Sequence, residues 1–282
     1  MTTSHPPNHL AKAPRQASAM LLAAGRGERM RPLTDTTPKP LLPVRGKPLM
    51  QWPLEGLARG GVQSVMINTA WLGEQIPAHF GETFTAPGLP PVGLIYSDEG
   101  REFGGALETA GGIVRALPHL ADVFWVAAGD IYAPEFEFSA GAYESFTASP
   151  KLAHIWLVPN PAHNPAGDFG LSAEGLALNL PKTTVMPGPA SPNSPAVQAL
   201  GHQPAPHAAL SPRYTFSTIA LYKRAFFEAA WCPIPTGNPE GVKAPLAAML
   251  RAAMDQGLVS ASLYEGLWVD VGTPERLAQL NA

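Results

Sequence analysis

The sequence predicts an α/β fold in which a Rossmann-like, mostly parallel sheet is flanked by helices. Two features of the first half support this fold class. Short apolar runs, such as residues 19–24 and 123–128, are typical of parallel strands that are buried on both faces. Segments with helical spacing of apolar residues separate these runs, and alternating strands and helices build parallel sheets that helices cover on both faces.

The elements follow one another regularly as far as residue 128. Strands are expected at residues 19–24, 64–68, 92–96 and 123–128. Helices are expected at residues 48–59, 74–80 and 106–117, and Gly60 and Gly61 end the first of them.

The second half of the sequence is less regular. Strands are expected at residues 154–158, 169–171, 214–221 and 267–270, with a helix at 244–256. A last helix is expected after Thr273, which is its N-cap residue and is followed by Pro274 at the first helical position.

Two segments are expected to lie outside a single folded domain of residues 19–282. Residues 1–18 mix polar residues and prolines without an apolar run, which predicts a disordered tail and argues against a signal peptide. Residues 181–212 carry many Pro, Ala and Ser residues, so we expect a flexible excursion on the surface.

The composition restricts the classes of function. A formal net charge of -3, from 22 acidic and 19 basic residues, is too balanced for a nucleic-acid-binding face. No apolar stretch approaches the roughly 20 residues of a membrane span. The single cysteine, Cys232, excludes an internal disulfide and fits a cytoplasmic location. We therefore expect neither nucleic acid nor membrane as a partner.

The segment after the first expected strand carries the strongest signal. It reads Leu22-Ala-Ala-Gly25-Arg-Gly27-Glu-Arg29-Met-Arg31-Pro-Leu-Thr34 and continues with Pro38-Lys39-Pro40. Glycines after a buried strand let backbone N–H groups approach a phosphate closely. Arg26, Arg29 and Lys39 can neutralise a triphosphate. The segment matches neither the P-loop nor the dinucleotide-binding motif, because no Lys-Ser/Thr pair follows the glycines and Met30 replaces the third glycine.

Two aspartates, Asp130 and Asp270, each follow or end an expected strand. The carboxyl ends of parallel strands face the crevice where α/β sheets bind ligands. Either residue alone could belong to a turn or cap a helix. Together with a phosphate loop they predict a metal site, because Mg²⁺ prefers one or two carboxylates combined with phosphate oxygens.

The string Gly-x-Gly-x-Arg-Met-x-Pro-Leu-Thr followed by Pro-Lys-Pro resembles the signature of sugar-phosphate nucleotidyltransferases. The resemblance extends from residue 20 to 280, apart from the Pro-rich excursion. It implies an enzyme that transfers a nucleoside monophosphate from a nucleoside triphosphate to a sugar 1-phosphate and releases pyrophosphate. It also implies a nucleotide-binding half at residues 19–135 and a sugar-binding half at 136–282.

The same resemblance implies roles for individual residues. Mg²⁺ would lie on Asp130 and Asp270, and the catalytic residues would be Arg29, Lys39 and Asp130. The nucleotide would contact Leu22, Ala23, Gly25, Gly27, Arg29, Lys39, Glu108, Thr109 and Gly111. For Gly111 and Gly112 an alternative is that glycine only permits close helix packing.

Shorter strings narrow the expected substrates. They are Ile67-Asn-Thr-Ala-Trp71-Leu-Gly73, Leu107-Glu-Thr-Ala-Gly-Gly-Ile113, Gly167-Asp168-Phe169, Phe216-Ser217 and Trp268-Val-Asp-Val-Gly-Thr273. They are similar to a uridylyltransferase branch of the family and imply UTP and N-acetylmuramate α-1-phosphate, a sugar of cell-wall peptidoglycan recycling. Sugar contacts are then expected at Gly167, Asp168, Ser217 and Trp268. Two alternatives stay open: a GDP- or dTDP-sugar product from a hexose or heptose phosphate, and a sensing module without turnover.

Overall fold

The computed structural model describes residues 17–181 and 212–282. Residues 1–16 of the expected disordered tail (1–18) and residues 182–211 of the expected excursion (181–212) lie outside the described residues. The first strand, β1, runs over Ala17–Leu22. Ala17 and Ser18 therefore belong to the folded domain and not to the tail, because the apolar run begins two residues before the predicted start.

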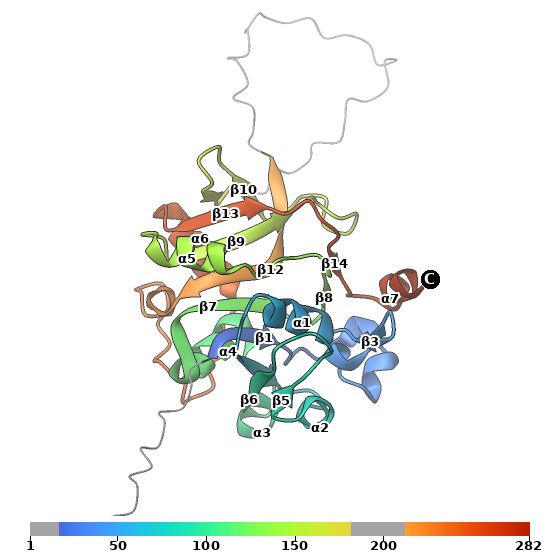
Figure 1. Cartoon of the computed structure of the whole chain (residues 1–282). Helices are drawn as coiled ribbons and strands as arrows, with labels where there is room; N and C mark the ends of the chain where they lie inside the picture. The colour runs from blue at the N-terminus through green and yellow to red at the C-terminus, as the bar shows by residue number, and fades with distance from the viewer. Residues whose placement is uncertain (1–16, 182–211) are drawn as a thin grey trace, which may run out of the picture.

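A ten-stranded sheet runs through the molecule in the order β11-β10-β12-β7-β1-β4-β6-β5, with β9 paired to β12 and β13 paired to β9 (Figure 1). Its remaining strands are β4 (Ser64–Thr69), β5 (Thr83–Phe84), β6 (Val92–Asp98), β7 (Leu120–Ala128), β9 (Ala153–Val158), β10 (Phe169–Leu171), β11 (Ala177–Leu178), β12 (Arg213–Lys223) and β13 (Val259–Leu263). The pairs β1–β4, β1–β7 and β4–β6 are parallel, whereas β12 is antiparallel to β7 and β9. The predicted fold class is confirmed, with β12 adding an antiparallel second half.

Helices flank this sheet as predicted. They are α1 (Gln51–Arg59), α2 (Gln75–Phe80), α3 (Glu99–Phe103), α4 (Glu108–Ala116), α5 (Ala140–Ala148), α6 (Leu246–Asp255) and α7 (Pro274–Asn281). The Thr273 hydroxyl accepts a hydrogen bond from the Arg276 backbone N–H, so Thr273 is the N-cap of α7, as predicted.

Alternate residues of β7 contribute to two hydrophobic cores. Phe124 and Val126 pack on one face with residues of α4 and α6. Trp125 and Ala127 pack on the other face with residues of α1, α2 and α5. Because side chains of a strand alternate between faces, burial on both faces explains why this run is continuously apolar.

A third, smaller cluster fixes the segment after β1 to the C-terminal helix. Met30, Leu49 and Val271 are 0% exposed in it, and Leu277 of α7 contacts them. Full burial of such a side chain contributes about 1.5–3 kcal/mol. Two short strand pairs complete the region: β2 (Pro43–Val44) with β3 (Lys47–Pro48), and β8 (Ile131–Tyr132) with β14 (Val269–Asp270).

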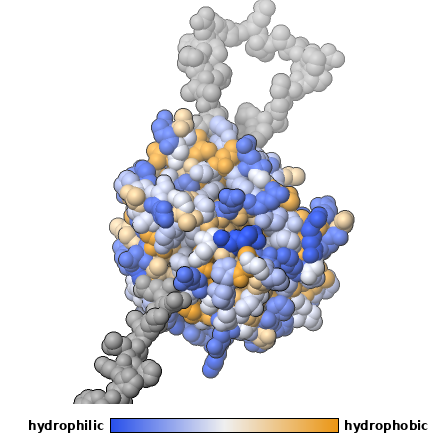
Figure 2. Space-filling model, in the orientation of Figure 1, coloured by the Kyte–Doolittle hydropathy of each residue, from blue (hydrophilic) through white to orange (hydrophobic). Residues whose placement is uncertain are grey.

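The visible surface is mainly hydrophilic, with small scattered hydrophobic groups (Figure 2). Among the described residues, the most exposed large hydrophobic side chain is Leu267 at 49%. In the same part of the chain, every helix is too short or too polar to cross a bilayer.

Candidate active site

The loop after β1 is shaped by Gly27. Its backbone φ is 66°, which glycine adopts without steric cost. Its carbonyl accepts a hydrogen bond of 2.9 Å from the Thr34 hydroxyl. A Cβ at this position would lie 3.1 Å from Thr34 Cγ2 and 3.2 Å from Lys39 Cβ. Conformation and close approach both require glycine here, and the loop folds back onto Lys39.

Arg26 and Trp71 close the same loop from the outside. The Arg26 guanidinium carbon lies 3.3 Å from the centroid of the Trp71 ring. Arg26 Nη1 donates to the Thr34 carbonyl at 3.0 Å, and Trp71 Nε1 donates to the same oxygen at 2.8 Å. Two donors on one carbonyl, together with a cation–π contact, hold the loop against the end of β4.

Lys39 connects this loop to the carboxyl end of β7. Its side chain is 10% exposed, and its ammonium forms an ion pair with the Asp130 carboxylate. A buried ammonium needs such a partner, because its removal from water is costly. The contact places a cation and an anion together at the edge where α/β sheets bind ligands.

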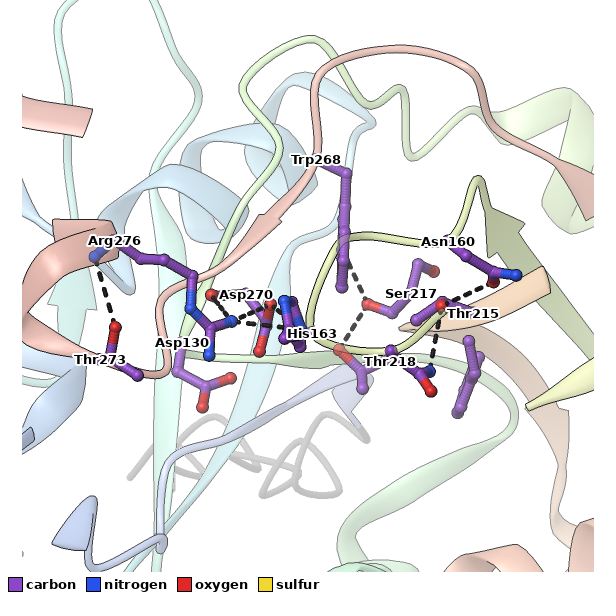
Figure 3. A network of polar contacts seen from close by, with 12 residues as sticks. Asp130, Asn160, His163, Thr215, Ser217, Thr218, Trp268, Asp270, Thr273 and Arg276 are labelled. Carbon is purple, nitrogen blue, oxygen red and sulfur yellow. Dashed lines mark hydrogen bonds and ion pairs between the residues drawn. The ribbon is translucent and has the colours of Figure 1, made fainter. Parts of the chain in front are cut away.

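Asp130 and Asp270 lie on neighbouring segments. Strands β8 and β14 pair in antiparallel orientation with Asp270 opposite Ile131, and the Val271 N–H donates to the Asp130 carbonyl at 3.0 Å. Figure 3 shows both carboxylates in one region of the site. Two acids separated by 140 positions in the sequence are thus brought together by a short strand pair.

The Asp270 carboxylate is itself held by two side chains (Figure 3). Arg276 Nη1 donates to the carboxylate and, at 2.8 Å, to the Asp270 carbonyl. His163 Nε2 lies 2.9 Å from Asp270 Oδ1. Each of the two acids therefore faces a basic side chain.

The two acids fit a magnesium ion that phosphates also bind. Their side chains are 38% and 26% exposed for Asp130 and Asp270, so both can be reached from solvent. Within residues 17–181 and 212–282, no cluster of three or more His, Cys, Asp or Glu side chains could hold a metal ion. Asp130 and Asp270 are the residues that could hold Mg²⁺, which commonly takes one or two carboxylates and completes its coordination with phosphate oxygens and water.

A buried polar chain lies behind the loop on the side of β4. The Ala23 N–H donates to Asn68 Oδ1 at 2.9 Å, and Asn68 Nδ2 donates to Glu99 Oε1 at 2.7 Å. The other oxygen of Glu99 accepts from the Leu107 N–H at 2.8 Å. Burial raises the pKa of Glu99, although these hydrogen bonds favour its charged form.

Glu108 begins α4 in a strained conformation. Its φ is 62°, a region that side chains other than glycine rarely adopt. Such residues concentrate at functional sites, because the surrounding structure must hold them there. Glu108 is exposed and, with the half-buried Thr109, lines the cleft beside the loop.

At the other end of the site, the Asp168 carboxylate organises the start of β12. It accepts hydrogen bonds from the Phe216 N–H at 2.9 Å and from Asn164 Nδ2 at 3.2 Å. Asn164 also donates to Thr215 Oγ1, which in turn donates to Asn160 (Figure 3). Asp168 thus fixes two segments that border the cleft.

Ser217 is buried beneath the residues that border the cleft. It is 0% exposed, and its hydroxyl donates to the Trp156 carbonyl at 2.7 Å and accepts from the Ile219 N–H at 3.1 Å. Trp268 Nε1 donates to the Ser217 carbonyl at 3.0 Å (Figure 3). The next residue, Thr218, has a φ of 63° and lines the cleft.

One cleft of about 760 Å³ joins these parts. At one end it is lined by the phosphate loop, Glu108, Thr109 and Asp130, and at the other by Asp168, Phe169, Phe216 and Thr218. Its floor is formed by β7, β12 and α6. The volume is that of a site for small molecules, with apolar walls and a few polar groups.

Comparisons with known proteins agree with this geometry. The family model described as nucleotidyl transferase matches residues 18–184. N-acetylmuramate alpha-1-phosphate uridylyltransferase of Neisseria meningitidis serogroup B is 42% identical over 267 residues, which cover 94% of this chain and 96% of that protein. The chain belongs to the sugar-phosphate nucleotidyltransferase family.

Two further proteins are similar to this nucleotidyltransferase. The N-acetylmuramate alpha-1-phosphate uridylyltransferase of Caulobacter vibrioides is 32% identical over 252 residues, covering 83% of this chain and 96% of that protein. A solved structure from Bacillus anthracis, assigned as a glucose-1-phosphate thymidylyltransferase, has the same fold with a TM-score of 0.64 and 20% identity over 94% of this chain and 93% of its own.

The structure brings some of the predicted site residues of the nucleotidyltransferase to the cleft and leaves others beside it. The cleft is lined by Leu22, Gly25, Glu108, Thr109, Asp130 and Asp168. Gly27, Lys39, Asp270 and Trp268 support it through the contacts described above. Arg29 is exposed in a short 3₁₀ helix next to the loop, and Gly167 precedes Asp168 with a φ of 60°.

Three predicted contacts use groups that already have partners in the protein. The Ala23 N–H is bound by Asn68, and the Ser217 hydroxyl is buried. The Gly111 N–H donates to the Ala244 carbonyl at 3.2 Å, and a Cβ at Gly111 would lie 2.4 Å from the Val242 carbonyl oxygen. A Cβ at Gly112 would lie 2.5 Å from Glu99 Oε1. Close packing therefore explains both glycines.

Sequence reasoning missed several residues of the site. Asn68, Glu99, Thr218 and Arg251 line the cleft but were not singled out. For Asn68 a signal existed, because it is a polar residue at the end of an apolar strand. No such signal existed for Thr218 and Arg251, because their positions in the cleft depend on the pairing of β12 and on the docking of α6.

Proposed function

We propose that this enzyme transfers UMP from UTP to N-acetylmuramate α-1-phosphate in the cytoplasm, giving UDP-N-acetylmuramate and pyrophosphate for peptidoglycan recycling. The supporting observation is that Asp130 lines the cleft beside the phosphate loop, with Lys39 paired to it and Asp270 on the strand that pairs next to it. The names of the two relatives that align along most of this chain support the choice of nucleotide and sugar.

The proposed reaction needs no protein nucleophile. An oxygen of the sugar phosphate attacks the α-phosphorus of UTP, a new O–P bond forms, and the bond to the bridging oxygen of pyrophosphate breaks. Catalysis then depends on position and on stabilisation of the negative charge that develops. Asp130 and Asp270 would hold Mg²⁺, which neutralises charge on phosphate oxygens when it is bound.

The basic side chains of the loop have separate roles in binding phosphate and in holding the loop in shape. Arg29 and the backbone N–H groups around Gly25 and Gly27 bind the departing pyrophosphate. Lys39 balances charge near the reacting phosphates, and its bond to Asp130 fixes its position before substrates enter. Arg26 acts indirectly, because its contacts with Trp71 and Thr34 hold the loop in shape.

A substrate matrix tests the proposal. Pyrophosphate release is measured in the presence of Mg²⁺ with UTP, dTTP, GTP or CTP, each combined with N-acetylmuramate, N-acetylglucosamine, glucose or mannose 1-phosphate. We expect the highest kcat/KM for UTP with N-acetylmuramate 1-phosphate. Turnover only with GTP and a mannose phosphate would refute the proposal, and binding without turnover would show a sensing module.

A further inference from the structure

Arg251 lines the end of the cleft that Asp168 and Phe169 also line, away from the phosphate loop. It projects from α6. Among the described residues that line the cleft, the basic ones are Arg26 and Arg251. Arg26 is engaged by the phosphate loop, so Arg251 is the basic group of the opposite end.

The partners of Arg251 are all neutral. Its Nη1 donates to Asn179 Oδ1 at 2.7 Å and its Nη2 to the Asp168 carbonyl at 3.4 Å. Its guanidinium carbon lies 4.9 Å from the centroid of the Phe169 ring. None of these contacts neutralises the positive charge.

Two carboxylates lie near Arg251, but neither forms an ion pair with it: Asp255, one turn along α6, accepts instead from Asn179 Nδ2 at 3.0 and 3.1 Å. Within residues 17–181 and 212–282, Arg251 takes part in no ion pair; the Asp168 carboxylate is turned to Phe216 and Asn164. Residues 1–16 and 182–211 contain no Asp or Glu. A second arginine, Arg213, lies close by: burial lowers the pKa of Arg213, the charge of Arg251 lowers it further, and the charge of Asp168 raises it. Arg251 therefore keeps donors that no carboxylate of the described residues occupies.

The two arginines differ in what they can still bind. Arg213 donates to the backbone carbonyls of Ala166, Gly167 and Asp168, so its donors fix the loop before β10. Arg251 uses two donors of the five in its planar fork, and this fork matches a carboxylate in bidentate geometry.

We propose that Arg251 binds a carboxylate carried by the sugar and thereby selects an acidic amino-sugar 1-phosphate over its neutral counterpart. The inference rests on the proposed function, because N-acetylmuramate differs from N-acetylglucosamine by a lactyl ether with one carboxylate. The phosphate of the sugar lies at the Lys39 and Asp130 end, and the lactyl group reaches the Arg251 end of the same cleft.

The test compares two sugars in three variants. Initial rates with UTP and Mg²⁺ give kcat/KM for N-acetylmuramate 1-phosphate and for N-acetylglucosamine 1-phosphate in wild type, Arg251→Met and Arg251→Lys. Asn179→Ala keeps the guanidinium and its charge but removes one hydrogen bond to it, so this variant measures how much the placement of Arg251 contributes. Thermal unfolding of each variant verifies that it is folded.

We expect Arg251→Met to lower kcat/KM for N-acetylmuramate 1-phosphate about 10- to 100-fold, the usual effect of losing a hydrogen bond to a charged group. The value for N-acetylglucosamine 1-phosphate should change less than about twofold, since it has no carboxylate to lose. Arg251→Lys should lose less than Arg251→Met. Asn179→Ala should also lose less than Arg251→Met, because the positive charge remains, and its loss should be confined to N-acetylmuramate 1-phosphate.

The outcomes separate the inference from the function on which it rests. An equal loss for both sugars in Arg251→Met or in Asn179→Ala would show a structural role and overturn the inference alone. A wild-type enzyme that does not use N-acetylmuramate 1-phosphate would overturn both.

Discussion

The two ends of the cleft are built by different means. At the phosphate end, the parallel strands β1, β4 and β7 all finish at one edge, so loops that follow strands carry the functional groups. At the other end, which we propose binds the sugar and call the sugar end, the antiparallel strand β12 supplies residues from its own length, and hydrogen bonds such as that from the Phe216 N–H to Asp168 set their positions.

This difference determines what a substitution does. Residues at the phosphate end, such as Lys39 and Asp130, interact with each other through charge and have few other partners. Polar residues at the sugar end, such as Ser217, are mostly bound to backbone groups. Changes at the phosphate end should therefore affect catalysis, and many changes at the sugar end should affect stability first.

Asp130→Asn should have the largest effect on activity. The amide keeps the shape of the side chain but removes the charge that positions Lys39 and that would bind Mg²⁺. We expect kcat to fall by about a factor of 1,000, in line with the loss of a group that stabilises the charge of the transition state. Pyrophosphate release at saturating substrates measures it, with thermal unfolding as the control for folding. Activity close to wild type would remove Asp130 from the catalytic machinery.

Trp71→Leu should have an intermediate effect at the same end. The change removes the ring beneath Arg26 and a donor to the Thr34 carbonyl, which loosens the phosphate loop. A cation–π contact and one hydrogen bond together contribute about 1–2 kcal/mol, so KM for the nucleotide should rise roughly 5- to 30-fold.

Trp71→Phe is the matched variant, because it keeps an aromatic ring but lacks the indole donor. It should lie between wild type and Trp71→Leu in the KM for the nucleotide. A rise in the KM for the sugar phosphate instead would show that Trp71 does not act through the loop.

Ser217→Ala, at the sugar end, should lower stability and leave activity almost unchanged. The hydroxyl is buried and bound to two backbone groups, so its loss leaves the Ile219 N–H and the Trp156 carbonyl without that partner. We expect the free energy of unfolding to fall by about 1–3 kcal/mol. The KM for the sugar phosphate should change less than about threefold, because the hydroxyl cannot reach the sugar. Denaturant unfolding and steady-state kinetics measure the two effects, and a large rise in KM at unchanged stability would restore Ser217 as a sugar contact.

The sequence was most informative where structure is local. The strands of the parallel sheet were found because burial on both faces leaves a continuous apolar run, as in β7. Helix α5 and strand β13 were not found. In α5, Phe146 is the buried residue, so no apolar face stands out. Strand β13 reads Val-Ser-Ala-Ser-Leu, an alternation typical of a strand, but it is only five residues long and was overlooked. Boundaries moved by a few residues where helix N-termini use no side-chain cap, as in α1 and α4.

Prediction of the site from the sequence was likewise limited to residues that are close together along the chain. The phosphate loop is contiguous, so its motif could be read directly from residues 22–40. The partners of Asp270 could not be inferred, because Arg276 and His163 reach it from α7 and from the segment between β9 and β10. For Gly111, packing and ligand binding leave the same trace in a sequence. The contacts in the structure explain the glycine by close packing, and the nucleotide contact there stays a prediction.

The smallest effect on activity is expected at His154, in the second half but remote from the cleft residues. Burial lowers the pKa of His154 to about 4, whereas the unfolded chain takes up the proton near its ordinary value of 6.5. The unfolded state thus binds more protons between these values, and stability that is present above pH 6.5 is lost as the pH falls towards 4. Between pH 7.5 and 5, wild type should lose roughly 2 kcal/mol of unfolding free energy through this group.

His154→Gln, which cannot titrate, should lose less stability over the same pH range and keep wild-type activity at pH 7.5. Chemical denaturation at the two pH values measures the difference between the two proteins. A variant with the same pH dependence as wild type would mean that other groups cause the acid sensitivity. A His154→Gln variant that loses activity at pH 7.5 would contradict the distinction between stabilising and catalytic groups. It would show that a polar group that stabilises the second half also contributes to catalysis.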